Sequence, residues 1–206
     1  MKTLIYITLS AFMLSGILAS CKKGDDDPFL SLRTRRARLA GSWTVSSGEL
    51  TTKNTGTDHY DYTTTSLNGT SATYKALLIE NGDTINNSTT NFDITITYTF
   101  EKDGSYKKVQ TGTGSSITEE GSWSFIGKSK DKELKNKEAI MLTMLKSTTV
   151  STNPNSTYVE EYKQTMGNVY VISRLANKEL EFSYSSSAEN PEMSYTSTES
   201  YVLTQD

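Results

Sequence analysis

The sequence predicts an all-β fold, an antiparallel up-and-down β-barrel preceded by a short N-terminal helix. From Gly41 onward, apolar and polar residues alternate with a period of two, which is the periodicity of a half-buried strand. Short turn signals such as Asn68-Gly69 and Asn81-Gly82 separate the alternating segments, as in consecutive hairpins. The 206 residues include 12 tyrosines, many threonines and only 3 prolines, a composition that favours long, uninterrupted strands.

The elements follow one another along the chain without a second domain. Residues 29–39 carry Leu32 and Leu39 at helical spacing and predict a short helix. A first strand opens at Gly41, and Lys102-Asp103-Gly104 predicts a further hairpin turn. The remaining predicted strands span residues 73–80, 91–101, 106–111, 119–126, 139–148, 157–165, 169–175, 179–185 and 195–204. Nine or ten consecutive strands would leave two open edges, and closure into a barrel removes both.

One segment shows the alternation most clearly and supplies the candidate interior residues. In residues 91–101 every second side chain is apolar, while the intervening ones are Asn, Asp, Thr and Glu. Trp123 and Phe125 share one face of a later strand, and Glu119 has the same parity and would reach the barrel mouth. The predicted ligand-contacting residues are therefore Phe92, Ile94, Ile96, Tyr98, Phe100, Trp123, Phe125 and Glu119.

The N-terminus carries a targeting signal. Lys2 precedes an apolar run from Leu4 to Leu18, which is shorter than the ~20 residues that a spanning helix needs. Ala19, Ser20 and Cys21 then complete a motif that resembles a bacterial lipobox. We therefore expect residues 1–20 to be a signal peptide, Cys21 to carry acyl chains such as palmitate, residues 21–28 to be a flexible tether, and residues 29–206 to form the barrel domain. The alternative is an ordinary secretory signal that happens to contain the cysteine.

Composition limits the partners and the chemistry. Cys21 is the only cysteine, so the chain forms no internal disulfide and no cysteine-based zinc site. The net charge of −3 disfavours nucleic acid as a partner. The predicted partner is instead a membrane, reached through the lipid anchor.

The residues after Cys21 bear on the location. Asp25, Asp26 and Asp27 resemble the export signal of Bacteroidetes surface lipoproteins, which implies the outer membrane and favours the cell surface over the periplasmic face. The alternative for this acidic stretch is a solvated tether. Four arginines in residues 33–38 would either contact anionic lipid or belong to a helix that plugs one end of the domain, and we favour the plug.

The order of several motifs resembles the lipocalin-like domains of Bacteroidetes lipoproteins. Gly41-Ser42-Trp43 opens the first strand, and Gly121-Ser122-Trp123 follows much later. The resemblance implies that Gly41 turns the chain into the barrel floor and that Trp43 closes that end. Residues 201–205 lack the arginine that stacks on the tryptophan in typical lipocalins. We interpret the two Gly-Ser-Trp triplets as two strand starts, not as a repeat.

The candidates for catalysis are few. His59 is the only histidine, with Asp58 and Asp61 nearby, and a solvated loop is the simpler interpretation. The pairs Glu119-Glu120 and Glu160-Glu161 would point to opposite faces of their strands. The sequence therefore predicts neither an enzyme nor a metal or other cofactor.

Two functions remain from the sequence. The first is a lipid-anchored barrel whose open end binds a small apolar molecule. The second is a surface module with a packed interior that assists glycan capture or outer-membrane assembly. Its contact surface would be a tyrosine row, either Tyr60 with Tyr62 or Tyr158 with Tyr162.

Overall fold

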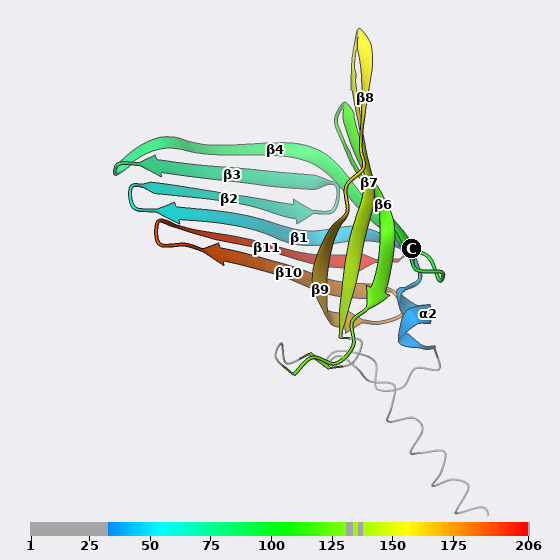
Figure 1. Cartoon of the computed structure of the whole chain (residues 1–206). Coiled ribbons are helices and arrows are strands. Elements are labelled where there is room, and N and C mark those ends of the chain that lie inside the picture. Colours follow the sequence, from blue (N-terminus) through cyan, green and yellow to red (C-terminus); the bar gives the residue numbers. More distant parts are fainter. Residues whose placement is uncertain (1–32, 131–133, 136–137, 206) are drawn as a thin grey trace, which may run out of the picture.

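The computed structural model describes residues 33–130, 134–135 and 138–205, and most of these residues are in β-strands (Figure 1). The predicted signal peptide, Cys21, the tether and the first residues of the predicted helix lie outside these ranges. Within them, no helix is long and apolar enough to cross a membrane. The elements in chain order are α2 (Arg35–Leu39), β1 (Gly41–Gly56), β2 (His59–Asn68), β3 (Ser71–Glu80), β4 (Asp83–Phe100), β5 (Ser105–Gly112), β6 (Ser115–Phe125), β7 (Ala139–Asn153), β8 (Ser156–Tyr162), β9 (Met166–Leu175), β10 (Glu179–Glu189) and β11 (Met193–Thr204).

The strands form a closed antiparallel barrel, as predicted. Their order is β6-β5-β4-β3-β2-β1-β11-β10-β9-β7-β8, and pairing between β6 and β7 closes the ring. Ten strands belong to the barrel, and β8 is an additional strand that pairs with β7 alone. Since neighbours in the chain are mostly neighbours in the sheet, the architecture is the up-and-down meander that short hairpins favour.

The barrel is narrower at one end than at the other. At the end beside α2, Gly41–Thr44 of β1 pair directly with Thr97–Phe100 of β4. The β2–β3 hairpin is inserted between the same two strands farther along, so eight strands close this end and the hairpin adds two strands to the wall beyond it. Because barrel diameter grows with strand number, the wall widens away from the helix.

Beyond the narrow end the wall separates into two groups of strands (Figure 1). We call residues 49–66, 73–91 and 184–199, from β1–β4, β10 and β11, leaf A, and residues 110–119 and 145–162, from β5–β8, leaf B. Pairing between β9 and β10 stops at Val171 and Ser183, and pairing between β4 and β5 stops at Ile94 and Gly112. The leaves therefore diverge from a shared base.

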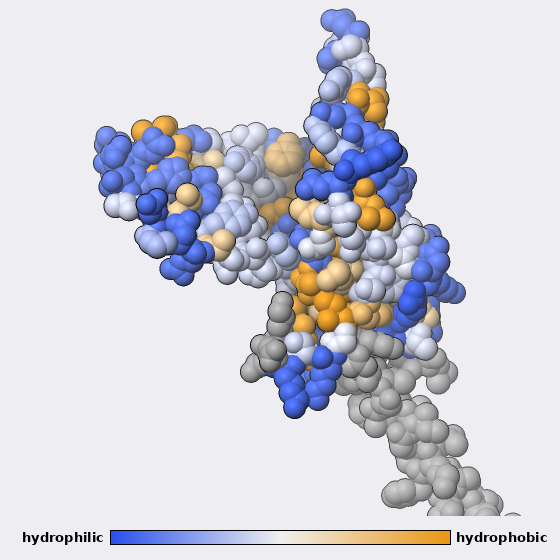
Figure 2. Space-filling view, viewed as in Figure 1, coloured by the Kyte–Doolittle hydropathy of each residue, from blue (hydrophilic) through white to orange (hydrophobic). Residues whose placement is uncertain are grey.

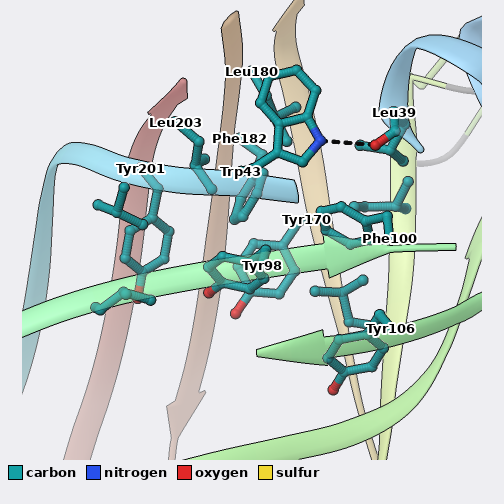
Figure 3. Close-up of a cluster of buried hydrophobic side chains, with 14 of the residues drawn as sticks. Leu39, Trp43, Tyr98, Phe100, Tyr106, Tyr170, Leu180, Phe182, Tyr201 and Leu203 are labelled. Carbon is teal, nitrogen blue, oxygen red and sulfur yellow. Dashed lines mark hydrogen bonds between the residues drawn. The ribbon is translucent and has the colours of Figure 1, made fainter. Parts of the chain in front are cut away.

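The apolar core lies at the narrow end (Figure 3). Trp43 is fully buried, and its indole N–H donates a hydrogen bond to the carbonyl oxygen of Leu39 at 2.8 Å. Leu180 and Leu203 are also fully buried beside it. The β1 backbone begins at Gly41 with φ +143°, a conformation that favours glycine, and a Cβ there would press on the side chain of Gln205.

The short helix covers this end of the barrel. Thr34 caps it by accepting the Ala37 N–H at 3.2 Å. Arg38 is buried and donates to the carbonyl oxygen of Leu175. The Arg36 guanidinium lies 5.0 Å from the Trp123 ring centre and donates to the Lys102 carbonyl oxygen at 3.0 Å. These contacts support the plug interpretation of the arginine cluster, because Arg35 and Arg38 are buried and Arg36 contacts the barrel at its surface.

Several strands are longer than the sequence pattern indicates. β4 begins at Asp83, whereas alternation predicts a start at residue 91, and β7 runs to Asn153 where we expected residue 148. The extra residues lie in the leaves, where both faces meet solvent and the contrast between apolar and polar positions disappears. The turn at Asn81-Gly82 is as predicted, with φ of 52° and 84° as a tight hairpin requires.

The second Gly-Ser-Trp triplet is not a strand start. Gly121 lies in the middle of β6, where the register with β7 shifts between Glu120 and Gly121. A Cβ at Gly121 would overlap the carbonyl oxygen of Thr143 and press on the Tyr106 ring. Glycine is required here because the two strands that close the barrel approach closely.

We therefore predict that Gly121→Ala lowers the free energy of unfolding by about 1–3 kcal/mol, because the added methyl group overpacks the closing seam. Urea denaturation followed by tryptophan fluorescence measures the change. Gly127→Ala is the matched control, since no atom lies within 4 Å of a Cβ built there. Equal stability of the two variants would show that the seam tolerates the methyl group.

Candidate functional site

A layer of tyrosines separates the apolar core from the wide end of the barrel. Tyr98, Tyr106, Tyr170 and Tyr201 come from β4, β5, β9 and β11, and each is 5% exposed or less. The ring centres of Tyr98, Tyr170 and Tyr201 lie 5.5, 4.9 and 5.6 Å from that of Phe182. Figure 3 shows the hydroxyl oxygens of Tyr98, Tyr106 and Tyr201 on the side away from Trp43. The layer is apolar toward the core and presents hydroxyl groups toward the mouth.

An ion pair lies above the tyrosine layer. Lys108 on β5 and Glu119 on β6 are directly opposite in the strand register, and Nζ lies 3.3 Å from Oε1. The Lys108 Nζ atom is also 5.8 Å from the ring centre of Tyr98. The ammonium group is thus held between a carboxylate and an aromatic face.

A second carboxylate enters from the opposite wall. Glu199 on β11 accepts hydrogen bonds at Oε2 from the hydroxyl groups of Tyr170, at 2.9 Å, and Tyr201, at 3.2 Å. These two donors fix the carboxylate over the tyrosine layer. Tyr170 also contacts Tyr184, with ring centres 5.6 Å apart, so the aromatic surface continues into leaf A.

These groups enclose a cavity of about 190 Å³ at the base of the two leaves. Side chains from six strands converge on it, although their residues are far apart in the sequence. Its lining residues are Tyr98, Tyr106, Lys108, Glu119, Leu142, Met144, Met166, Asn168, Tyr170 and Glu199. The lining combines apolar walls with charged and amide groups, so it is more polar than the small apolar ligand predicted from the sequence would require.

One polar atom in this cavity has no partner. The Tyr98 hydroxyl is buried and makes no hydrogen bond with any residue that the structure describes. An unpaired buried hydroxyl costs roughly 1–3 kcal/mol. A ligand or a water molecule in the cavity would remove that cost.

Burial controls ionisation at the site. It raises the pKa of Tyr98 well above its usual value, with a further contribution from the charge of Glu199. Burial also raises the pKa of Tyr170 and Tyr201, and it raises the pKa of Tyr106 to about 12. Burial acts to lower the pKa of Lys108, but Glu119, with smaller contributions from Tyr201 and Glu199, outweighs it, so this pKa is raised. The cavity therefore holds neutral phenols and a charged ammonium group at neutral pH.

The predicted ligand-contacting residues divide into three groups. Tyr98 and Glu119 line the cavity. Ile96, Phe100 and Trp123 are buried in the core, and Phe125 packs against it. Phe92 is 37% exposed and so is not an interior residue as predicted; it lines a separate depression formed by β4, β5 and β6, which Ile94, itself buried in the core, also borders.

The sequence analysis missed eight of the ten cavity residues, which are Tyr106, Lys108, Leu142, Met144, Met166, Asn168, Tyr170 and Glu199. A signal existed for Lys108, because it shares strand parity with Tyr106 and so faces the interior. A lysine inside a barrel is read as a surface residue unless its partner, here Glu119, is recognised on the next strand. Glu199 likewise shares strand parity with Tyr201 and Leu203, although the Ser and Thr residues before it weaken the alternation.

The other polar candidates lie elsewhere. Nδ1 of His59 is 3.7 Å from Glu80 Oε1 at the exposed end of leaf A. Across the described ranges, no group of three or more His, Cys, Asp or Glu side chains is arranged to hold a metal ion. A larger depression, of about 360 Å³, is lined in part by Glu49, Glu181 and Ser200 on the outer face of the wall.

The two tyrosine rows differ in exposure. Tyr60 and Tyr62 are half-buried and stacked, with ring centres 6.4 Å apart. Tyr158 and Tyr162 on β8 are 61% and 53% exposed, and Val159 between them is 60% exposed. Figure 2 shows apolar patches on both leaves, each surrounded by hydrophilic residues.

Comparisons with known proteins give little further information. No family model matches the sequence, and no curated protein matches it. Among solved structures, the crystal structure of Rv2717c from M. tuberculosis is similar, with 16% identity over 82% of this chain and 94% of that chain, and a TM-score of 0.31.

The buried tyrosines predict a loss of stability at high pH. In the unfolded chain a tyrosine ionises near pH ~10, whereas the folded barrel keeps these phenols protonated to higher pH. The stabilising effect is complete below about pH 10 and is lost as the pH rises through the folded pKa, which for Tyr106 is about 12. Urea unfolding from about pH 8 to about pH 11 should show the decline. Tyr170→Phe should reduce the slope and the exposed-site control Tyr158→Phe should not, whereas equal slopes would contradict the assignment.

Proposed function

We propose that this protein is a binding protein, a barrel tethered by lipid outside the cytoplasm, which holds a compact molecule at its wide end. The observation that carries the proposal is the cavity in which side chains from six strands meet around the unpaired hydroxyl of Tyr98. Concave sites with apolar walls and a few convergent polar groups are typical of small-molecule binding.

The lining indicates the character of the ligand. Leu142, Met144 and Met166 supply apolar wall, whereas Lys108, Glu119 and Asn168 supply hydrogen-bonding groups. A ligand that fills the cavity would have both an apolar part and a polar part. At about 190 Å³ the cavity is smaller than the ~300–1,000 Å³ of most ligand pockets, so the ligand is compact.

The location is proposed from the N-terminal motif. An acylated Cys21 would hold the barrel at the outer membrane, and the acidic residues that follow favour the cell surface. The narrow, helix-covered end carries residue 33 and is the end nearest to the anchor in sequence. The open end would then be the part of the barrel available to ligand.

A second candidate function is docking of a partner at the surface, in glycan capture or membrane assembly. The observation that favours it is the exposed row of Tyr158, Val159 and Tyr162 on β8, a strand with a neighbour on one side only. The two functions differ in the residues that they require. Substitution of Tyr158 and Tyr162 would abolish docking and leave ligand binding intact.

Native mass spectrometry of the full-length protein from its own host tests the binding function. We expect a bound molecule that dissociates on collisional activation, and we expect Asn168→Phe to lose it because the ring fills the cavity. Val169→Phe is the matched control, since this neighbour on β9 lies outside the cavity lining. A wild-type protein without a bound molecule, or an Asn168→Phe variant that retains it, would contradict the proposal.

Metabolic labelling with an alkyne analogue of palmitate tests the anchor. We expect the parent protein to be labelled and the Cys21→Ala variant to be unlabelled, because Cys21 is the only thiol. The variant should also move from the membrane fraction to the soluble fraction. Equal labelling of both proteins would refute the assignment.

A further inference from the structure

We propose that the ligand of this cavity carries an ammonium group, for which Glu199 provides the counterion. This inference rests on the proposed binding function and specifies the chemical class of its ligand. It follows from the charges at the site, the hydrogen bonds that Glu199 leaves unused, and the aromatic rings around it.

The charges at the cavity do not balance. Lys108 is paired with Glu119 at 3.3 Å. Glu199 forms no ion pair in the part of the chain that the structure describes, since its hydrogen bonds come from two neutral tyrosines. One lysine and two glutamates leave the lining with one net negative charge. A carboxylate in a partly enclosed site gains from a cationic partner, and an anionic ligand would be repelled.

Glu199 accepts hydrogen bonds at only one of its two carboxylate oxygens within the described residues. Tyr170 and Tyr201 both donate to Oε2, and within the described ranges Oε1 accepts no hydrogen bond. The Tyr98 oxygen, which also has no partner, is a second acceptor because a hydroxyl group has two lone pairs. An ammonium group has up to three N–H donors and could satisfy both atoms.

The aromatic surroundings suit a cation. The rings of Tyr98, Tyr106 and Tyr170 line the cavity, and Tyr184 extends the surface beside Tyr170. Lys108 already shows that an ammonium group is accommodated here, 5.8 Å from the Tyr98 ring centre. Glu119 neutralises that lysine, so its charge does not close the site to a second cation. Met144 and Met166 provide adaptable walls for the rest of the ligand.

Isothermal titration calorimetry on the full-length protein, with any endogenous ligand removed, tests this inference. The probes are butylamine and phenethylamine, with phenethyl alcohol and phenylacetate as neutral and anionic counterparts of similar shape. We expect at least one amine to bind roughly tenfold or more tightly than the alcohol, because a hydrogen bond to a charged group is stronger than one between neutral groups. Phenylacetate should show no binding.

Glu199→Gln keeps the shape of the side chain and removes its charge. We expect it to weaken amine binding by roughly tenfold and to leave binding of the alcohol unchanged. Glu181→Gln, on the outer face of β10, is the matched control and should behave as wild type. If Glu199→Gln fails to fold, Glu119→Gln serves in its place, because it removes one negative charge from the cavity without touching the hydrogen bonds of Glu199.

The outcomes separate this inference from the proposed function. Equal binding of amine and alcohol, no effect of either glutamate substitution, or no amine binding at all would overturn the ammonium assignment. If native mass spectrometry still shows a molecule that Asn168→Phe expels, the binding function stands with a different ligand class. If native mass spectrometry shows no bound molecule and no probe binds, both the binding function and the ammonium assignment are refuted.

Discussion

The direct pairing of β1 with β4 at the narrow end is the constraint on which the rest of this structure depends. It brings Gly41–Thr44 against Thr97–Phe100 and closes the base with eight strands. A ring of this size is filled by side chains, and here Trp43, Phe100 and Phe182 fill it. The tyrosine layer rests on these rings, and the charged groups lie above the tyrosines. The cavity lies where this core ends, at the base of the two leaves, and β4, β5, β6, β7, β9 and β11 supply its lining.

The physical signals that define this fold are unevenly distributed along the chain. Where one face is buried, as in residues 94–100, alternation identifies both the strand and its inner face. Where a leaf meets solvent on both faces, as in residues 83–90, no apolar–polar alternation distinguishes the two faces, and the predicted strand is therefore shorter than the observed one. Hairpin turns with positive φ, such as Asn81-Gly82, are local and are therefore predictable. The direct β1–β4 contact joins distant segments, and no local pattern specifies it.

The candidate site was only partly predictable for a related reason. Tyr98 and Glu119 follow from strand parity, which is a property of each strand alone. Parity also places Lys108 beside Tyr106 and Glu199 beside Tyr201, but whether such a charge faces the interior depends on its partners across the barrel, which closure and register set. A buried charge is recognised from sequence only when its partner is known, and these partners come from other strands. Parity also placed Phe100 and Trp123 inside correctly, but it does not distinguish packed core from cavity wall.

The inserted hairpin of β2 and β3 has a consequence for how such a protein can change. Only its end nearest the base, with Leu67 and Ala72, belongs to the core, so the rest of the hairpin can vary in length and sequence without disturbing the aromatic rings that stabilise the domain. Lengthening or shortening that part would change the extent of leaf A while the floor stays constant. The architecture thus separates the part of the chain that confers stability from a projecting part that is free to diverge between homologous barrels.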